Sequence, residues 1–356
     1  MTATTVPFNA LVAESIARHS KIAPENIIVL DNSDKYCPDG IKSKNTTSQQ
    51  EQDEEESLAA IFDTMACLNR AALSDQTLCA GPSGSGPSFR SALLSATDEL
   101  VNLAGGRPVR YVELGPEPWK SSAILTRLLD AGVQLCQYVG IDINPESEKT
   151  MRDALVPIIG EKRFAYLIAD FYKITADDLP ALPGDMSPTG SEVVTVMTNL
   201  GFQEGNDLPS RLGPMLTRLT KPGNLVLSEM QVLQDQDEAS AVEEFYHLPE
   251  MLRFSSLVGK KFDPHFSLDK PEDYEYIFNL VPLHISEIGQ VKVATTLVSV
   301  PLPDKKGKHY VLTNSCLKYT REQFERAREA LGKFGVRACK ETGDRSVVFQ
   351  IAERTD

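Results

Sequence analysis

The sequence predicts an α/β fold, a doubly wound parallel sheet with a second, α+β lobe, and three observations support this prediction. From Val109 to Met230, short apolar strands alternate with amphipathic helices, which is typical of a parallel sheet with right-handed crossovers. After Gln231 the alternation stops, and two strand-like runs flank a short polar turn, which favours antiparallel pairing. The chain has 356 residues, and this length suits two lobes better than one core.

The N-terminal part is expected to belong to the second lobe. Its apolar spacing predicts helices over residues 9–20, 58–73 and 89–106, and a short strand over 26–30. Residues 39–57 contain almost no apolar side chains. Such a segment cannot bury enough surface to order itself, so it is predicted to be a mobile loop.

Five strands make up the regular part. They are predicted over residues 109–114, 138–143, 164–171, 193–201 and 224–230. The helix after the first strand buries a stripe that includes Ile124 and Leu128 and stops at Gly132. Further helices are predicted over residues 145–160 and 207–223.

The remaining elements complete both lobes. A helical segment is predicted over residues 237–259, and a pair of strands over 292–302 and 309–319. A helix over 321–335 and a strand over 345–354 follow. The simplest division is then an N-terminal segment of the second lobe (1–89), a core (90–230), a second-lobe insertion (231–318) and a return to the core (319–356).

Composition excludes several classes of function. The formal net charge is −14, and such a field repels nucleic acid. The six cysteines are scattered without a CxxC pair, and the histidines show no metal spacing, so we expect neither a disulfide framework nor a metal site. No apolar run is long enough for a bilayer, and the first twenty residues lack the pattern of a signal peptide. A cytoplasmic protein that acts on a small molecule is expected.

Acidic residues mark the ends of three neighbouring predicted strands. The first strand ends at Glu113 and Gly115, the second at Asp142, and the third at Asp170 and Phe171. Ligands of doubly wound sheets bind beyond these carboxyl ends, so the expected cofactor-binding residues are Glu113, Gly115, Asp142, Asp170 and Phe171. Asp142 can accept hydrogen bonds from both hydroxyls of a ribose, as in NAD or S-adenosylmethionine, while Asp170 and Phe171 offer an acceptor and an aromatic face to adenine.

The turn after the first strand separates these two cofactors. Its sequence, ELGPEPWKS, has one glycine, two prolines without amide donors, and an acid at Glu117. A pyrophosphate needs closely spaced glycines and free backbone amides, whereas a sulfonium tolerates the acids. S-adenosylmethionine is therefore the predicted cofactor. Taken alone, Glu117 could equally be a helix N-cap, and Trp119 could either cover the ligand or wedge the turn.

Six stretches of the chain carry a resemblance to a known family. They read YVELGPEPWKSSAILTRLLDAG, YVGIDIN, IADFY, LGFQEGN, KPGNLVLSEM and TNSCLKYTREQFERAREALGKFG. From Arg107 to the C-terminus, the sequence resembles the histidine-specific Nα-methyltransferases, a family of S-adenosylmethionine-dependent amino-acid N-methyltransferases with a Rossmann-like core. The resemblance implies that Gly115 contacts the cofactor, that Asp142 holds its ribose, and that Asp170 and Phe171 hold its adenine.

The substrate segments match the family only in part. In the family motif L-G-S-x-x-G-N, the Asn holds the substrate amino group, and Asn206 stands there. In the motif T-E-x-S-x-K-[FY], the Glu and Ser grip the imidazole, but Asn314 and Cys316 occupy those positions. The resemblance therefore implies N-methylation of an amino acid or related small amine other than histidine, with Asn206, Asn314 and Cys316 contacting it.

Chemistry at the acceptor leaves alternatives open. An ammonium must lose a proton before it can attack a methyl group, and Glu204 beside Asn206 could take that proton or could be a solvated acid at a helix start. The acceptor atom could instead be oxygen or carbon of a specialised metabolite. The altered LGFQEGN and TNSCLKY segments are also compatible with a cofactor-binding scaffold that has lost catalysis. A dehydrogenase is the remotest alternative.

Overall fold

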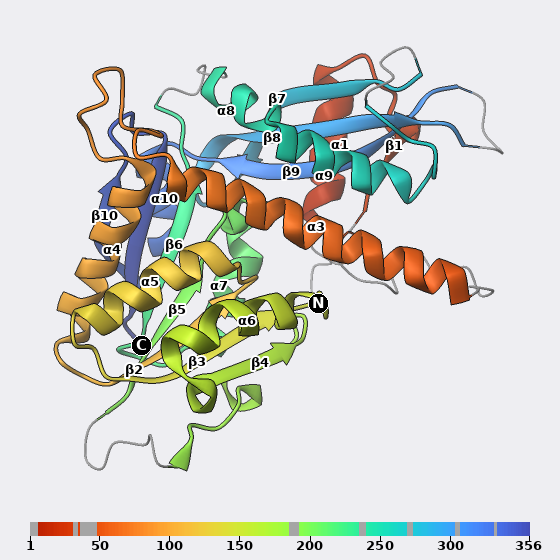
Figure 1. Ribbon diagram of the computed structural model, residues 1–356. Coiled ribbons are helices and arrows are strands. Elements are labelled where there is room, and N and C mark those ends of the chain that lie inside the picture. The colour runs from red at the N-terminus through yellow and green to blue at the C-terminus, as the bar shows by residue number, and fades with distance from the viewer. Residues whose placement is uncertain are drawn as a thin grey trace, which may run out of the picture.

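Two β-sheets organise the chain, and one long helix lies between them. The computed structural model describes residues 6–30, 35, 48–184, 192–234, 240–268, 273–302, 307–330 and 333–356. Helix α3 (Ser48–Ser74) packs against α9 (Pro249–Lys260) on the side of the smaller sheet. On the side of the larger sheet it packs against α4 (Phe89–Ala104) and α5 (Pro118–Asp130). Figure 1 shows α3 crossing the molecule between the two layers.

The larger sheet is the predicted doubly wound sheet. In spatial order its strands are β10 (Phe334–Glu341), β11 (Val347–Arg354), β6 (Leu225–Gln231), β5 (Val194–Asn199), β2 (Val109–Leu114), β3 (Leu135–Asp142) and β4 (Phe164–Ile168). The strands from β6 to β4 are parallel, and β11 is antiparallel to both of its neighbours. The chain steps outward from β2 in both directions, so the strand order reverses between β2 and β5, where such folds bind ligands.

Helices cover both faces of this sheet. On one face lie α4 (Phe89–Ala104), α5 (Pro118–Asp130) and α6 (Ser147–Ile159), whose buried side chains join one core cluster. On the other face lie α7 (Pro209–Leu219) and α10 (Arg321–Glu329), which contact each other. Single turns of 3-10 helix connect several elements: η1 (Pro24–Asn26), η3 (Glu161–Arg163), η4 (Ala176–Asp178) and η6 (Gln203–Asn206).

The smaller sheet has the order β1 (Ile27–Ile28), β9 (His309–Lys318), β8 (Gly289–Val300) and β7 (Tyr276–Ile285). The predicted antiparallel pairing of β8 with β9 is confirmed. Helix α1 (Phe8–His19) packs on one face, and α9 (Pro249–Lys260), preceded by α8 (Ser240–Tyr246), packs on the other. Strands from the start and from the last third of the chain therefore share one sheet. The division of the chain into domains at residues 90, 231 and 319 stays a prediction.

Several predicted boundaries are wrong. Residues 48–57, predicted as loop, form the first turns of α3, because Glu and Gln are good helix formers even without apolar partners; residues 39–47 lie outside the described part. The helix predicted over 237–259 breaks before Pro249 into α8 and α9. The helix predicted to reach residue 335 gives way to β10, which starts at Phe334.

Strands β7 and β10 were not predicted at all. Both are edge strands whose side chains are mostly half-buried, so they lack the strong alternation of apolar and polar residues that marks a half-buried strand in a sequence.

Over the ranges described, no helix is both long enough and apolar enough to pass through a bilayer.

A row of stacked aromatic rings lies on the face of the larger sheet that α5 and α6 cover. The rings of Tyr111 and Tyr138 stack at a centroid distance of 5.9 Å, and those of Tyr138 and Phe164 at 5.6 Å. The ring of Tyr166 continues the row across Gly140, where a Cβ atom would lie 2.5 Å from a carbon of that ring. Glycine at this position is therefore required by packing.

Replacing Gly140 by alanine should lower the free energy of unfolding by about 1–3 kcal/mol, because the new methyl group overpacks the Tyr166 ring. Urea titration followed by circular dichroism measures the loss. Combining Gly140→Ala with Tyr166→Leu should cost less than the sum of the two single changes, since the smaller side chain can move aside. A fully additive double variant would contradict this packing argument.

Candidate functional site

The turn between β2 and α5 is closed by an acid of the chain itself. Gly115 adopts a left-handed conformation with φ of +56°. Two residues later, the Glu117 carboxylate caps α5 and accepts hydrogen bonds from the backbone N–H groups of Trp119, at 2.9 Å, and of Lys120. Burial raises the pKa of Glu117 to about 7. Donors that could hold a phosphate are thus already occupied by a buried carboxyl group.

Glu113 lies beneath this turn rather than on its surface. Its carboxyl group is buried and accepts hydrogen bonds from the hydroxyls of Ser121, at 2.6 Å, and Tyr138, at 3.1 Å. Burial raises its pKa to about 8. Glu113 thus supports the turn by joining β2, β3 and α5, and its expected contact with a cofactor stays a prediction.

A buried ion pair links the same turn to the end of β5. The Lys120 Nζ atom lies 2.7 Å from Glu229 Oε2, and both side chains are almost completely buried. The same carboxylate oxygen accepts a hydrogen bond from the backbone N–H of Gly201 at 3.0 Å. The loops that follow β2 and β5 are thus held at a fixed separation by Lys120 and Glu229.

Asp142 ends β3 as predicted and has a carboxylate available to a ligand. Its Oδ1 atom accepts a hydrogen bond from the backbone N–H of Asn144 at 2.8 Å, and no ion pair joins it to a cation within the described ranges. Burial raises its pKa to about 6. The Asn144 side chain donates to the Leu58 carbonyl at 3.2 Å, so α3 lies over this end of the strand.

Asp170 and Phe171 follow β4, beside the end of β3. The backbone N–H of Ala169 donates to the Asp142 carbonyl at 2.8 Å, which brings the two strand ends together. The Asp170 carboxylate accepts from the backbone N–H of Tyr172 at 2.9 Å and lies 3.2 Å from Lys173 Nζ. Phe171 is half-buried. Gly115, Asp142, Asp170 and Phe171 therefore share the carboxyl edge of β2, β3 and β4.

The LGFQEGN segment lies directly against the smaller sheet. A Cβ atom at Gly205 would lie 2.5 Å from Cys316 Sγ and 2.8 Å from the Leu317 carbonyl oxygen, so glycine permits the close approach of η6 to β9. Asn206, at the end of η6, is half-buried. Asn314, two residues before Cys316, donates to Thr296 Oγ1 at 3.2 Å. The structure thus brings the predicted substrate segments together.

Sequence reasoning missed Gln203. Its Nε2 atom would lie 2.5 Å from a Cβ atom at Gly115, so its side chain lies over the turn between β2 and α5. The side-chain oxygens of Gln203 and Asn199 are buried without a hydrogen-bond partner among the described residues. Two acceptors near the ends of β2 and β5 therefore have no donor among the described residues. The signal available in the sequence was its neighbour Phe202, which stands where the family motif has Ser.

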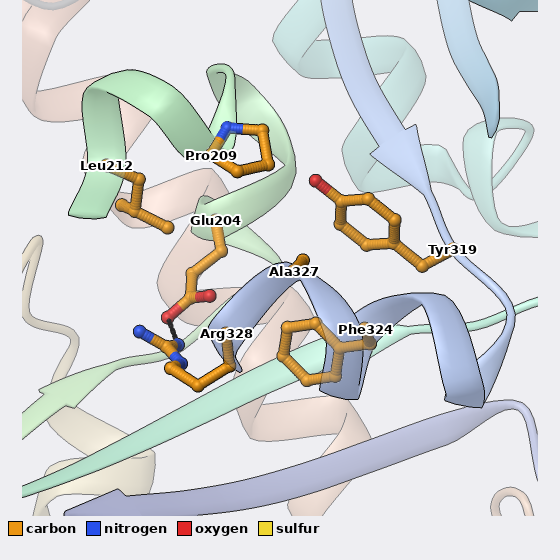
Figure 2. Close-up of a pocket in the computed structure, with 7 residues that line it drawn as sticks. All are labelled: Glu204, Pro209, Leu212, Tyr319, Phe324, Ala327 and Arg328. Carbon is orange, nitrogen blue, oxygen red and sulfur yellow. Dashed lines mark hydrogen bonds and ion pairs between the residues drawn. The ribbon is translucent and has the colours of Figure 1, made fainter. Parts of the chain in front are cut away.

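Glu204 points into the layer between the larger sheet and α10. Its carboxylate, which is buried, pairs with Arg328 of α10 and accepts a hydrogen bond from the Ser228 hydroxyl. The neighbouring cavity measures about 10 Å³, space for one water molecule at most. Figure 2 shows the pair among side chains of α7 and α10 and beside the ring of Tyr319. The expectation of a solvated acid is therefore wrong for Glu204, and the pair with Arg328 argues against a role as proton acceptor.

Trp119 lies on the surface of the turn. Its side chain is 41% exposed, and the guanidinium of Arg70 on α3 lies 5.0 Å from its ring centroid. It therefore joins α3 to the start of α5 instead of wedging the core. In the part of the chain that the structure describes, no group of three or more His, Cys, Asp or Glu side chains is arranged to bind a metal ion.

Comparisons with known proteins give similarities of fold at low identity. No family model matches the chain, and no curated protein matches it in sequence. The CcbJ methyltransferase from Streptomyces caelestis is 12% identical, with 74% of this chain and 90% of that chain covered and a TM-score of 0.40. SAM-bound CalS10, an amino pentose methyltransferase from Micromonospora echinaspora, is 16% identical, with coverages of 75% and 93% and a TM-score of 0.34. Human N-acetylserotonin methyltransferase in complex with SAM is 15% identical, with coverages of 74% and 51% and a TM-score of 0.35. At these values the fold assignment rests on the strand order of this chain.

Replacing Lys120 by methionine should lower the free energy of unfolding by about 3–5 kcal/mol, because Glu229 is then left buried without its cation. The double variant Lys120→Met/Glu229→Gln should recover most of this loss, since the amide oxygen can still accept from Gly201. Urea denaturation of the three proteins measures the difference. A double variant as unstable as the single one would show that the ion pair itself is not the source.

Proposed function

We propose that this protein is an S-adenosylmethionine-dependent methyltransferase that N-methylates an amino acid or related small amine other than histidine. The observation that carries the proposal is the charge of the candidate cofactor edge. The helix N-terminus is capped by Glu117, and Asp142 has no cation partner within the described ranges. Such an edge suits a positively charged ligand with a ribose and disfavours a dinucleotide, whose pyrophosphate needs free amides.

The residues present fit S-adenosylmethionine part by part. The Asp142 carboxylate can accept hydrogen bonds from the ribose hydroxyls, and Asp170 with Phe171 can contact the adenine. The unpartnered amide oxygens of Gln203 and Asn199 are acceptors for the ammonium of the methionine part, close to the Gly115 turn. A buried acceptor without a donor is costly, so a ligand that supplies donors gains affinity here.

The acceptor site is proposed at the junction of η6 with β9. Asn206 would hold the amine that is methylated, because its amide oxygen accepts from an amine without stabilising the ammonium form as a carboxylate would. Asn314 and Cys316 replace the acid and hydroxyl that grip an imidazole in the family that the sequence resembles. Neither can carry a carboxylate charge, and this supports a substrate other than histidine.

The role of the chain in the reaction is positioning. S-adenosylmethionine supplies an electrophilic methyl group on a sulfonium, and holding an amine in line with such a group is worth about 7–11 kcal/mol. Asp142 and the Gly115 turn would orient the donor, and Asn206 would orient the lone pair of the acceptor. With Glu204 paired to Arg328, the proton of the ammonium would leave to solvent.

Isothermal titration calorimetry tests the cofactor. The wild type should bind S-adenosylmethionine and S-adenosylhomocysteine but not NAD, and Asp142→Ala should abolish binding, whereas Asp98→Asn, which removes an exposed acid, should not. Protonation of Asp142 removes its negative charge and replaces part of its acceptor capacity by an O–H donor. Because its pKa is about 6, affinity for S-adenosylmethionine should fall as the pH drops through 6, by roughly tenfold between pH 7 and pH 5. Binding of NAD alone would refute the assignment.

Replacing Asn206 by alanine should leave S-adenosylmethionine affinity unchanged and lower turnover by about tenfold to a hundredfold, since the acceptor is no longer held in line. The substrate is first found by incubating the protein with amino acids and amines and detecting added methyl groups by mass spectrometry. Methylation on oxygen or carbon would replace the proposed acceptor atom. Cofactor binding without any product would instead support a scaffold, and an unchanged rate would remove Asn206 from the site.

A further inference from the structure

The turn from Phe202 to Asn206 sends consecutive side chains to different parts of the molecule. Phe202 packs against Phe245, with ring centroids 5.5 Å apart, on the side of the smaller sheet. Gln203 lies over Gly115. Glu204 points the other way, into the layer between the large sheet and α10. One short turn therefore touches both proposed binding regions and the helix layer behind them.

The backbone of this turn is not in a relaxed conformation. Phe202 has a φ of +59° and a ψ of +19°, the left-handed region that bulky residues rarely adopt. Such a conformation persists only when the surrounding structure enforces it, and it is common at functional sites. The contacts made by the neighbouring side chains must therefore hold the turn in place.

The pair of Glu204 and Arg328 is the most deeply buried of these contacts. The two residues are 4% and 2% exposed, and their sequence positions are 124 apart. Arg328 also donates to Ser228 Oγ at 2.7 Å and to Gln350 Oε1 at 3.2 Å, so β6 and β11 fix its guanidinium group. The cavity beside the pair measures about 10 Å³ and can hold one water molecule at most. The carboxylate of Glu204 therefore has no room there for a second position.

A buried ion pair is weak evidence for stability, because well-packed apolar side chains of similar volume often do as well or better. Its placement, however, is constrained: Arg328 Nη2 donates both to Glu204 and to Ser228 Oγ, and Arg328 Nε donates to Gln350. The pair is thus suited to fixing where the turn lies, between β9 on one side and Gly115 on the other.

We propose that Arg328 is a positioning residue for methyl transfer, which acts through Glu204 to hold the turn from Phe202 to Asn206 where Gln203 meets the cofactor and Asn206 meets the acceptor. This inference rests on the proposed function. Arg328 itself touches neither partner: its contacts lie with Glu204, Ser228 and Gln350. Helix α10, far from both strand ends in sequence, would thereby control the alignment of donor and acceptor.

The decisive variant replaces the charged pair by apolar side chains of similar length, Glu204→Leu/Arg328→Met. It should fold and be at least as stable as the wild type to urea, because no buried charge is left unpaired. Its kcat should fall about tenfold to a hundredfold, while its Kd for S-adenosylmethionine changes by less than about threefold, since Asp142 and the Gly115 turn are untouched. A stable double variant with the kcat of the wild type would overturn the proposal.

Single variants add a second comparison. Glu204→Gln and Arg328→Gln should each lower kcat, and the double variant Glu204→Gln/Arg328→Gln should be no slower than the slower single one, because the two residues act as one unit. Arg328→Lys, which keeps the charge but not the planar fork, should recover part of the rate. Leu100→Ala, a core truncation in α4, is the control for lost stability and should leave kcat unchanged. Additive losses would contradict the proposal.

Hydrogen exchange separates this inference from the proposed function. In the absence of any ligand, backbone amides of residues 202–206 should exchange faster in Glu204→Leu/Arg328→Met than in the wild type, whereas those of β2 should not. If the wild type binds no S-adenosylmethionine, the proposed function fails, and the exchange result still decides whether the pair holds the turn. Unchanged exchange in residues 202–206 would overturn the positioning role.

Discussion

The cap that Glu117 places on α5 determines the chemical character of the whole site. In many doubly wound sheets, the first helix leaves its backbone amides free for a phosphate. Here those amides are bonded to a buried carboxyl group of the chain, and Lys120 in the same turn is committed to Glu229. The remaining groups along the edge, Asp142 and Asp170, are acceptors. A ligand that brings positive charge and hydrogen-bond donors suits this edge, and an anion does not.

The same edge of the larger sheet is where the two sheets contact each other. Gly205 lets η6 approach Cys316 on β9, while Gln203 of the same turn lies over Gly115. The side chain of Asn144 reaches the backbone of α3, which itself contacts the helices of both layers. Because these contacts converge on the carboxyl edge of the large sheet, a small molecule held by the smaller sheet would lie beside whatever occupies the end of β3.

The candidate site contains buried acids, and burial makes their charged forms less stable than in water. Burial raises the pKa values of Glu113, Glu117 and Asp142, so ionising these acids costs stability that packing elsewhere must offset. The stacked rings on the sheet face beneath them contribute to that packing. Stability is commonly lower at sites that must recognise a ligand. Here Glu113 and Glu117 lie on either side of Gly115, and Asp142 lies at the end of the neighbouring strand β3.

The sequence by itself determined the parallel core and the acids Asp142 and Asp170 near the ends of two strands, because both depend on local patterns: apolar strands separated by amphipathic helices, with an acid where the strand ends. It left the role of Glu117 open and missed the edge strands β7 and β10, whose half-exposed side chains carry little pattern. Only the tertiary structure decided that Glu204 is paired with Arg328 and that Gln203 covers Gly115. Those contacts join residues 124 and 88 positions apart, and such distant neighbours are set by which faces of the elements pack together.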